Sequence, residues 1–360
     1  ARQHFNLAKK IFGDELNIAL ISGKTEYKEK KDILSKLLQN KIDIIFGTHA
    51  IFQKKVIFKN LGLIIIDEQH KFGVSQRKRL SDKGGKDCDI LLMTATPIPR
   101  TLTMTIFGDM DISIIKEKPK SRKSIKTYSK LENKIDDVIK FVRKEISLGN
   151  QIFWVCPLIE ESKRIDHTSA IKKFEYLKKL FPKQVLLLHG KTTIDEKENI
   201  LNSFLKNEFK ILVSTTIIEV GIDFPNANVI IIENANKFGL SQLHQLRGRV
   251  GRGSKASSCI LMFKSNLSEN AKKRINILKE SNDGFIISEA DMAIRGFGDL
   301  LGFKQSGIKN FKLADPIHNK DLFLLAEKEI KRIEKSNEDI KRFKPLIKLY
   351  DRADIINDIA

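Results

Sequence analysis

Three arginines and a glutamine stand on short, glycine-punctuated spacings in the segment Gln242–Gly253. Gln245, Arg249 and Arg252 complete the pattern Q-x-x-G-R-x-G-R, and Arg247 stands at one of its variable positions. An arginine guanidinium offers a fixed fork of donors that matches phosphate oxygens and stays charged at any working pH. Arginines held beside a transferring phosphoryl group stabilise the charge that develops on it. The segment therefore predicts phosphoryl chemistry, and the alternative is a basic surface loop that happens to contain glycine.

An apolar run that ends in acidic residues is the second candidate. Leu61–Ile66 is followed by Asp67 and Glu68. Such a strand delivers two carboxylates to the edge where open α/β sheets bind their ligands. We expect Asp67 to hold Mg²⁺ through water and Glu68 to polarise an attacking water. Solvated acids at an ordinary strand end are the alternative, and the following Gln69 and His70 make the pattern more specific.

Hydroxyl side chains follow two further expected strands. Thr94 and Thr96 can pass a change in hydrogen bonding from a nucleotide site to a neighbouring domain; a turn capped by Thr96 is a compatible alternative. Thr215 and Thr216 suit the phosphates of a nucleic-acid backbone. Asp223 can accept from a ribose hydroxyl or pair with an arginine. A capped turn is again the alternative for this second group.

Two short segments resemble the end of a phosphate-binding P-loop. They are Gly23–Thr25 and Gly190–Thr192. A P-loop also needs a glycine five residues before its final glycine, where this chain has Ile18 and Val185. We therefore expect two strand-to-helix turns and no P-loop in the 360 residues.

Composition sets the broad class of the protein. A chain of 360 residues with 41% apolar residues fits two or three packed domains. No apolar run is long enough to span a bilayer, and the first residues do not form a signal peptide, so we expect a cytoplasmic protein. Cys88, Cys156 and Cys259 lack metal-ligand spacing, and we expect all three to be buried in strands.

The charge balance is strongly basic. The chain has 65 Lys and Arg against 45 Asp and Glu, a net charge of +20. Such a charge favours a polyanion such as nucleic acid. A genome-wide compositional bias that scatters lysines over solvated faces is the alternative, so the motifs must carry the prediction.

Apolar, β-branched runs alternate with helical patterns, which predicts parallel sheets with helices on both faces. The expected strands are Asn17–Ser22, Ile42–Phe46, Gly62–Ile66, Ile90–Thr94, Ile125–Tyr128, Gln151–Cys156, Gln184–Leu188, Lys210–Ser214, Asn228–Ile232 and Ser257–Phe263. The expected helices are Lys28–Leu38, the segment after Pro97, Leu131–Leu148, Ala170–Leu180, Ile194–Leu205, Ser241–Leu246, Ser268–Lys279 and Lys320–Lys335. We expect two α/β domains at 1–117 and 124–265, a linker at 118–123, and a mostly helical region at 266–360.

Taken in order, these motifs resemble the superfamily 2 helicases and, more narrowly, the RecG branch-migration helicases. The resemblance rests on Gly47–Ala50, Asp67–Val74, Thr94–Thr101, Trp154–Cys156, Ile159–Ser162, Ile218–Asp223, Gln242–Gly253, Ser281–Phe285, Ile294–Gly302 and Gln305–Gly307. It covers essentially the whole chain. The transcription-repair coupling translocases share the element Arg295–Gly307, but Gln69 and Gly253 both favour RecG.

The resemblance implies a role for each matching residue. Asp67 matches the Mg²⁺ ligand, Glu68 the water-activating acid, and Gln245, Arg249 and Arg252 the motif that reaches the γ-phosphate of ATP across a domain cleft. The implied ATP-binding positions are Asp67, Gln69, His70, Gly221, Asp223, Arg249 and Arg252. The implied positions for DNA contact, or for its coupling to the nucleotide, are Thr94, Thr96, Thr215, Thr216, Asp223, Arg295 and Gln305. Arg295 and Gln305 belong to a translocation element at 291–307.

The resemblance also implies what precedes this stretch. RecG-like proteins begin with a wedge domain of OB fold, and their first motor domain opens with the P-loop. Ala1–His4 match the segment just after that loop. We therefore expect two tandem RecA-like domains, the first incomplete, in an N-terminally truncated motor. Phe297 departs from the family's usual proline, so this loop loses a fixed φ.

The implied function is an ATP-dependent translocase or helicase on double-stranded DNA. It remodels stalled forks and Holliday junctions in recombination and repair, using ATP and Mg²⁺. We expect a monomeric bacterial protein of the cytoplasm and nucleoid, with branched double-stranded DNA as its partner, no membrane contact, and no ATP hydrolysis by this chain alone. The alternatives are a transcription-repair coupling translocase and a nucleic-acid-binding remnant without motor activity.

Overall fold

The computed structural model describes residues 1–23, 25–68, 82–85, 87–95, 111–115, 117, 123–157, 163–215, 224–253, 255–295, 319–335, 340–343 and 345. The chain divides into two compact units, one containing residues 1–95 and the other residues 109–326. Most of the expected linker, residues 118–123, lies outside the described residues.

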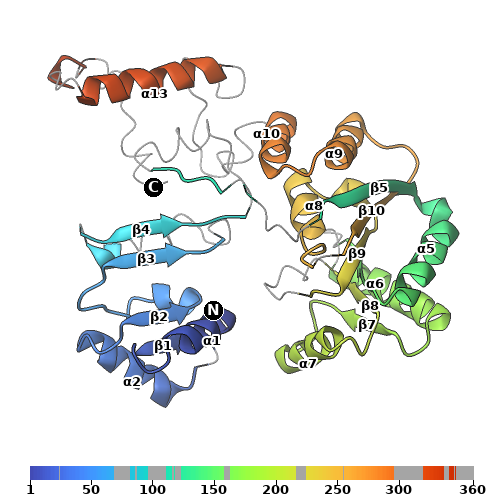
Figure 1. Ribbon diagram of the computed structural model, residues 1–360, viewed down its shortest axis with the longest axis horizontal. Coiled ribbons are helices and arrows are strands. Elements are labelled where there is room, and N and C mark those ends of the chain that lie inside the picture. The colour runs from blue at the N-terminus through green and yellow to red at the C-terminus, as the bar shows by residue number, and fades with distance from the viewer. Residues whose placement is uncertain are drawn as a thin grey trace. The chain divides into compact units, whose positions relative to one another are not determined.

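The first unit holds two separate pairs of parallel strands, and Figure 1 shows them. Strand β1 pairs with β2, and β3 with β4. Helix α1 packs on the first pair, where the ring of Phe5 lies 6.4 Å from that of Phe46. Helix α2 buries Ile33 and Leu37 against Ala19 on this pair. The elements are α1 (Arg2–Phe12), β1 (Ile18–Ile21), α2 (Tyr27–Leu38), β2 (Ile44–Gly47), the 3₁₀ helix η1 (His49–Phe52), β3 (Leu63–Ile66) and β4 (Asp89–Leu92).

The second unit is built on a six-stranded parallel sheet in the order β5-β10-β9-β6-β8-β7. Its strands are β5 (Ile125–Leu131), β6 (Gln151–Val155), β7 (Val185–Leu188), β8 (Ile211–Ser214), β9 (Ala227–Ile232) and β10 (Ser257–Phe263). Its helices are η3 (Glu132–Lys134), α5 (Ile135–Ser147), α6 (Lys163–Leu180), α7 (Ile194–Leu205), η5 (Ala235–Lys237), α8 (Leu240–Arg247), α9 (Glu269–Glu280) and α10 (Gly284–Arg295).

Side chains of this sheet alternate between two apolar cores. Ile152 and Trp154 pack in the core covered by α5 and α6. Phe153 and Val155 pack in the opposite core, covered by α7, α8, α9 and α10. All residues of β6, β8 and β9 are buried, as expected of parallel strands covered on both faces. Polar side chains can therefore reach solvent from these strands only at their ends.

The α/β fold with parallel sheets is confirmed, and the expected strands match within a few residues at their ends. Both P-loop lookalikes are strand-to-helix turns, after β1 and after β7, closed by bonds from the N–H groups of Ser22 and His189 to the hydroxyls of Thr25 and Thr192. Two more helices, α13 (Lys320–Lys335) and η6 (Ile340–Phe343), lie near the C-terminus. Among the described helices, none combines the length and the apolar character needed to cross a membrane.

Two details of the expectation were wrong. Helices α1 and α10 were not predicted: α1 has no capping side chain, and α10 begins at a glycine, which usually ends a helix. Of the three cysteines, Cys259 lies within a strand, Cys156 directly follows one, and Cys88 precedes β4 and is only partly buried. Cys88 is less covered because β4 itself carries exposed residues.

Helix α7 begins with a reciprocal pair of bonds that fixes its first turn. The Thr193 hydroxyl accepts from the N–H of Glu196 at 3.4 Å, and the Glu196 carboxylate accepts from the N–H of Thr193 at 2.9 Å. We expect Thr193→Ala to lower the free energy of unfolding by about 1 kcal/mol. Trp154 is the single tryptophan of the chain, so its emission in a urea titration reports the second unit. Thr193→Ser, which keeps the hydroxyl, is the control; equal stability of Thr193→Ala and wild type would contradict this role.

Candidate nucleotide and nucleic-acid site

The acidic pair lies at the carboxyl end of β3, as the sequence predicts. The Asp67 carboxylate is 56% exposed, and its Oδ2 lies 3.9 Å from Nε2 of His4. Glu68 adopts a φ of 53°, which is uncommon outside glycine. Residues held in this region cost on the order of 1–3 kcal/mol and cluster at functional sites. The strand therefore ends in a strained turn that presents both acids.

Glu68 also connects the ends of the two neighbouring strands. Its Oε2 accepts from the N–H of Ala95 at 3.4 Å, and β3 and β4 run in register from Leu63 to Ile66. Ala95 directly follows Thr94, so the acidic pair and the first hydroxyl segment are neighbours. Gln69, His70 and Thr96 lie outside the described residues.

The acids supply only part of a metal site. Within the described part of the chain, no three His, Cys, Asp or Glu side chains gather in a way that could hold a metal ion. Mg²⁺ is usually held by one or two carboxylates together with substrate phosphates and water. Asp67, exposed at the strand end, fits that type of site, and the remaining ligands would come from a nucleotide.

Thr215 stands at the carboxyl edge of the second sheet, directly after β8. It is 2% exposed, and its N–H donates to the Leu188 carbonyl at 3.4 Å. Its hydroxyl and that of Ser214 are buried and have no hydrogen-bond partner among the described residues. Such groups normally find a partner in protein, water or ligand. Thr216, Gly221 and Asp223 lie outside the described residues.

The arginine stretch begins on α8 and continues past its end. Gln245 and Arg249 are half-buried, and Arg252 is exposed, with its Nε 3.4 Å from the carbonyl of Gly248. Gly251 has a φ of 73°, and a Cβ there would lie 3.0 Å from Ile125. The glycine therefore lets the chain turn tightly against β5.

The Arg247 guanidinium is engaged inside the unit and is not available to a phosphate, contrary to the expectation from its spacing. Its side chain is 2% exposed. Nη1 donates to the carbonyls of Leu278 at 2.6 Å and Ser281 at 2.9 Å, and lies 3.3 Å from the Thr127 hydroxyl. Nη2 lies 3.0 Å from Nδ1 of His244. Burial lowers the pKa of Arg247. The guanidinium therefore ties α8 to β5 and to the end of α9.

Two further polar contacts hold α8 in place. The hydroxyl of Ser241 donates to the buried carboxylate of Asp291 on α10 at 2.6 Å. Arg274 on α9 donates to the carbonyls of Asn236 at 3.0 Å and Phe238 at 2.9 Å, just before α8 begins. Sequence reasoning did not identify Arg274 or Asp291. The helical spacing of Arg247 from Leu240 and Leu243 did place it on the buried face of α8, but that signal was not used.

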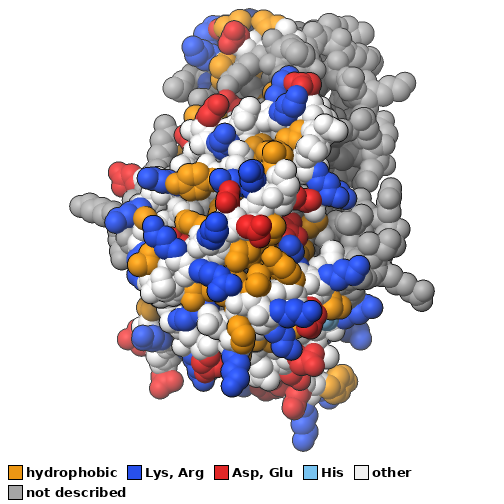
Figure 2. Space-filling view, turned by 90° about the vertical axis from the view of Figure 1, so that its right-hand side faces the viewer, with side chains coloured by type: hydrophobic (Ala, Val, Ile, Leu, Met, Phe, Trp, Pro, Cys, Tyr) orange, Lys and Arg blue, Asp and Glu red, His pale blue; other side chains and the backbone are white. Residues whose placement is uncertain are grey.

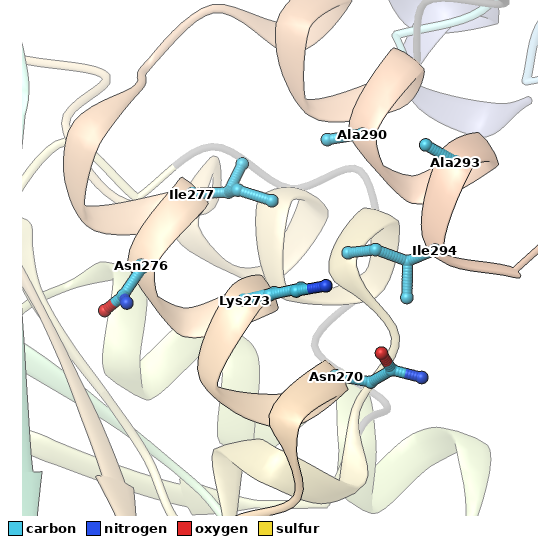
Figure 3. A pocket seen from close by; sticks show the side chains of 7 residues that line it. All are labelled: Asn270, Lys273, Asn276, Ile277, Ala290, Ala293 and Ile294. Atoms are coloured by element: carbon cyan, nitrogen blue, oxygen red, sulfur yellow. The ribbon is translucent and has the colours of Figure 1, made fainter.

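An open cavity of about 430 Å³ lies between α9 and α10 (Figure 3). Ile277, Ala290 and Ile294 turn toward its apolar interior, and the ammonium of Lys273 reaches across it. Ile294 directly precedes Arg295, the last residue of α10 and the first residue of the expected Arg295–Gly307 element. The remainder of that element, including Gln305, lies outside the described residues.

The surface charge is dispersed. On the face in Figure 2, Lys and Arg side chains are scattered among Asp and Glu side chains. The net charge of +20 therefore does not form a single stripe on this face. The distribution of charge on this face therefore does not by itself indicate a nucleic-acid-binding surface.

Comparisons with protein families divide the chain into three matches. The model described as "DEAD/DEAH box helicase" matches residues 1–105, and "Helicase conserved C-terminal domain" matches 133–254. "ATP-dependent DNA helicase RecG, domain 3, C-terminal" matches 281–349. The ATP-dependent DNA helicase RecG of Bacillus subtilis is 48% identical over 322 residues, which are 89% of this chain and 47% of that protein. The chain belongs to the RecG helicase family.

Further relatives agree with this assignment. RecG of Thermotoga maritima is 44% identical over 93% of this chain and 43% of its own length. A solved structure of RecG bound to a three-way DNA junction is 42% identical, with a TM-score of 0.67, over 89% of this chain and 42% of that one. Yeast Dbp5 bound to RNA, at 18% identity and a TM-score of 0.57, shows only a shared fold. The chain thus spans less than half the length of these RecG relatives.

Removing the buried guanidinium should destabilise the second unit. We expect Arg247→Ala to cost about 3 kcal/mol, because the carbonyls of Leu278 and Ser281 lose a charged donor and stay buried. Urea unfolding followed by Trp154 emission measures this. Arg252→Ala, at an exposed position of the same stretch, should change stability by less than about 0.5 kcal/mol. Similar losses for the two variants would refute the structural role of Arg247.

Proposed function

We propose that this chain is the motor portion of an ATP-dependent translocase that remodels branched double-stranded DNA. The observation that carries the proposal is the 48% identity to RecG over 89% of the chain, together with two general helicase matches and one RecG match. The similar structure bound to a three-way DNA junction supports a branched partner. The activity belongs to the whole protein, since the chain covers less than half of its relatives.

The ATP chemistry is assigned to two groups of residues. Asp67 would hold Mg²⁺, which would supply positive charge to the phosphates of a bound nucleotide. Glu68, held by the N–H of Ala95, accepts a hydrogen bond from the attacking water. Arg249 and Arg252 stabilise the γ-phosphate as it leaves. Gln245 orients the same phosphate, and Arg247 supports this group from the interior.

DNA handling is assigned to other residues of the motifs. Thr94 and Thr96 sense the acidic pair through the contact between Glu68 and Ala95. Thr215 and Thr216 stay predicted contacts of the DNA backbone, and the buried Thr215 hydroxyl, which has no partner among the described residues, supports a ligand there. Contacts of this kind position a protein on DNA without reading bases, so preference arises from branched shape. Arg295 and Gln305 stay predicted translocation residues, and Gln69, His70, Gly221 and Asp223 stay predicted ATP-binding positions.

The first unit supports the proposal that ATP turnover needs additional structure. Parallel strands are normally covered on both faces. Here Leu63 and Ile65 on β3 are 54% and 56% exposed, and Ile90 and Leu91 on β4 are 39% and 48% exposed. Among the described strands, β4 pairs with β3 alone. We infer that further secondary structure packs against these exposed apolar side chains in the working motor.

A nucleic-acid-binding remnant without motor activity is the second candidate. It is favoured by the lack of a complete P-loop pattern in the 360 residues. The RecG-specific match at 281–349 favours RecG over the transcription-repair coupling translocases. A monomeric state and a place in the bacterial cytoplasm and nucleoid stay predictions.

Phosphate release on a forked duplex separates these candidates. We expect this chain alone to bind the fork in a salt-sensitive manner and to show no DNA-stimulated turnover. Joined to a segment that supplies the phosphate-binding loop, it should hydrolyse ATP, and Glu68→Gln should lower kcat by at least about 100-fold. Turnover by the chain alone that Glu68→Gln abolishes would contradict the need for the loop. An active Glu68→Gln motor would contradict the role of Glu68.

A further inference from the structure

A nearly buried carboxylate at the carboxyl edge of the second sheet has no part in the chemistry above. Glu233 directly follows β9, its side chain is 15% exposed, and its N–H donates to the Val155 carbonyl at 2.9 Å. Its Oε1 accepts from Nζ of Lys173 at 2.7 Å and from Nε1 of Trp154 at 3.0 Å. The thiol of Cys156 lies 3.8 Å from its Oε2. The carboxylate thus joins β9, β6 and α6.

Lys173 is held in one position by this arrangement. Its ammonium lies 5.4 Å from the ring centroid of Trp154 and 5.3 Å from that of Tyr176, within the range of cation–π attraction. A lysine ammonium has three N–H donors. Glu233 accepts from the ammonium, and within the described part of the chain no second acceptor is found. The side chain is 21% exposed, so donors of a preoriented cation remain open to solvent.

The position of the Lys173 ammonium in the fold indicates which class of ligand it can contact. Strand β6 lies between β9 and β8, and the N–H of Cys156 donates to the Ser214 carbonyl at 2.8 Å. The Lys173–Glu233 pair therefore lies at the same carboxyl edge of the sheet as Thr215, whose buried hydroxyl lacks a partner among the described residues. A fixed ammonium and a hydroxyl group at the same sheet edge suit the phosphates of a nucleic-acid backbone.

We propose that Lys173 contacts a backbone phosphate of bound DNA and that Glu233 is the positioning residue that aims it. This inference rests on the proposed DNA-translocase function. Glu233 accepts one hydrogen bond from the ammonium and thereby fixes its orientation, as carboxylates orient metal ligands in other sites. A phosphate oxygen then accepts from one of the remaining N–H groups. The alternative is an ion pair that only joins α6 to the sheet.

The salt dependence of DNA binding distinguishes the two. Each neutralised phosphate contributes about −0.9 to the slope of log K against log salt. We expect Lys173→Met to make this slope less steep by about 1. The ratio of wild-type to Lys173→Met affinity should therefore fall about 3.5-fold when the salt is raised from about 50 mM to about 200 mM. Lys173→Arg should restore the slope. Lys172→Met, at an exposed position on the same helix, is the matched control and should leave the slope unchanged. Equal slopes for Lys173→Met and Lys172→Met would overturn the proposal.

The single tryptophan provides a test that needs no variant. Trp154 shares the Glu233 carboxylate with Lys173, so a phosphate that draws on the ammonium should change Trp154 emission as forked duplex is added. Emission that stays constant while the wild-type chain binds the fork would overturn the proposal even if Lys173→Met does not fold. Absence of any salt-sensitive binding by the wild type would instead overturn the proposed DNA-translocase function.

Discussion

Burial of both faces of the parallel sheet is the constraint on which the second unit depends. Once β6, β8 and β9 are covered by helices on each side, polar side chains from these strands can be solvated only at the strand ends. Thr215 and Glu233 each occupy such an end. The first unit differs, because β3 and β4 carry exposed apolar residues.

The second constraint on this unit is the charge of a buried arginine side chain. Arg247 is buried among apolar residues, and a guanidinium there is stable only if carbonyls and neighbouring polar groups take its donors. Leu278 and Ser281 provide those carbonyls, so the ends of α8 and α9 are fixed to each other. Arg249 and Arg252 come directly after this fixed end of α8, so they extend from a rigid support. A flexible support would lose the advantage of preorganised charge near a phosphate.

The strands, the α/β class and the candidate motifs could be predicted from the sequence, because apolar periodicity and strand-end residues are local signals. The role of Arg247 could not be predicted from motif spacing alone, since the three arginines share one residue type and only Arg247 lies on α8, on its buried face. The link between Lys173, Trp154 and Glu233 spans 79 residues at its longest and arises from strand order. Helix α10 was missed because its first residue is a glycine.

The central claim is that these residues form a motor that responds to branched DNA. The most direct test is the rate of ATP hydrolysis by the motor, completed with its phosphate-binding loop, on a forked duplex and on a linear duplex of equal length. The account predicts faster hydrolysis on the fork, and loss of that stimulation in Arg252→Ala although DNA is still bound. Equal rates on the two DNAs, or full stimulation in Arg252→Ala, would contradict it.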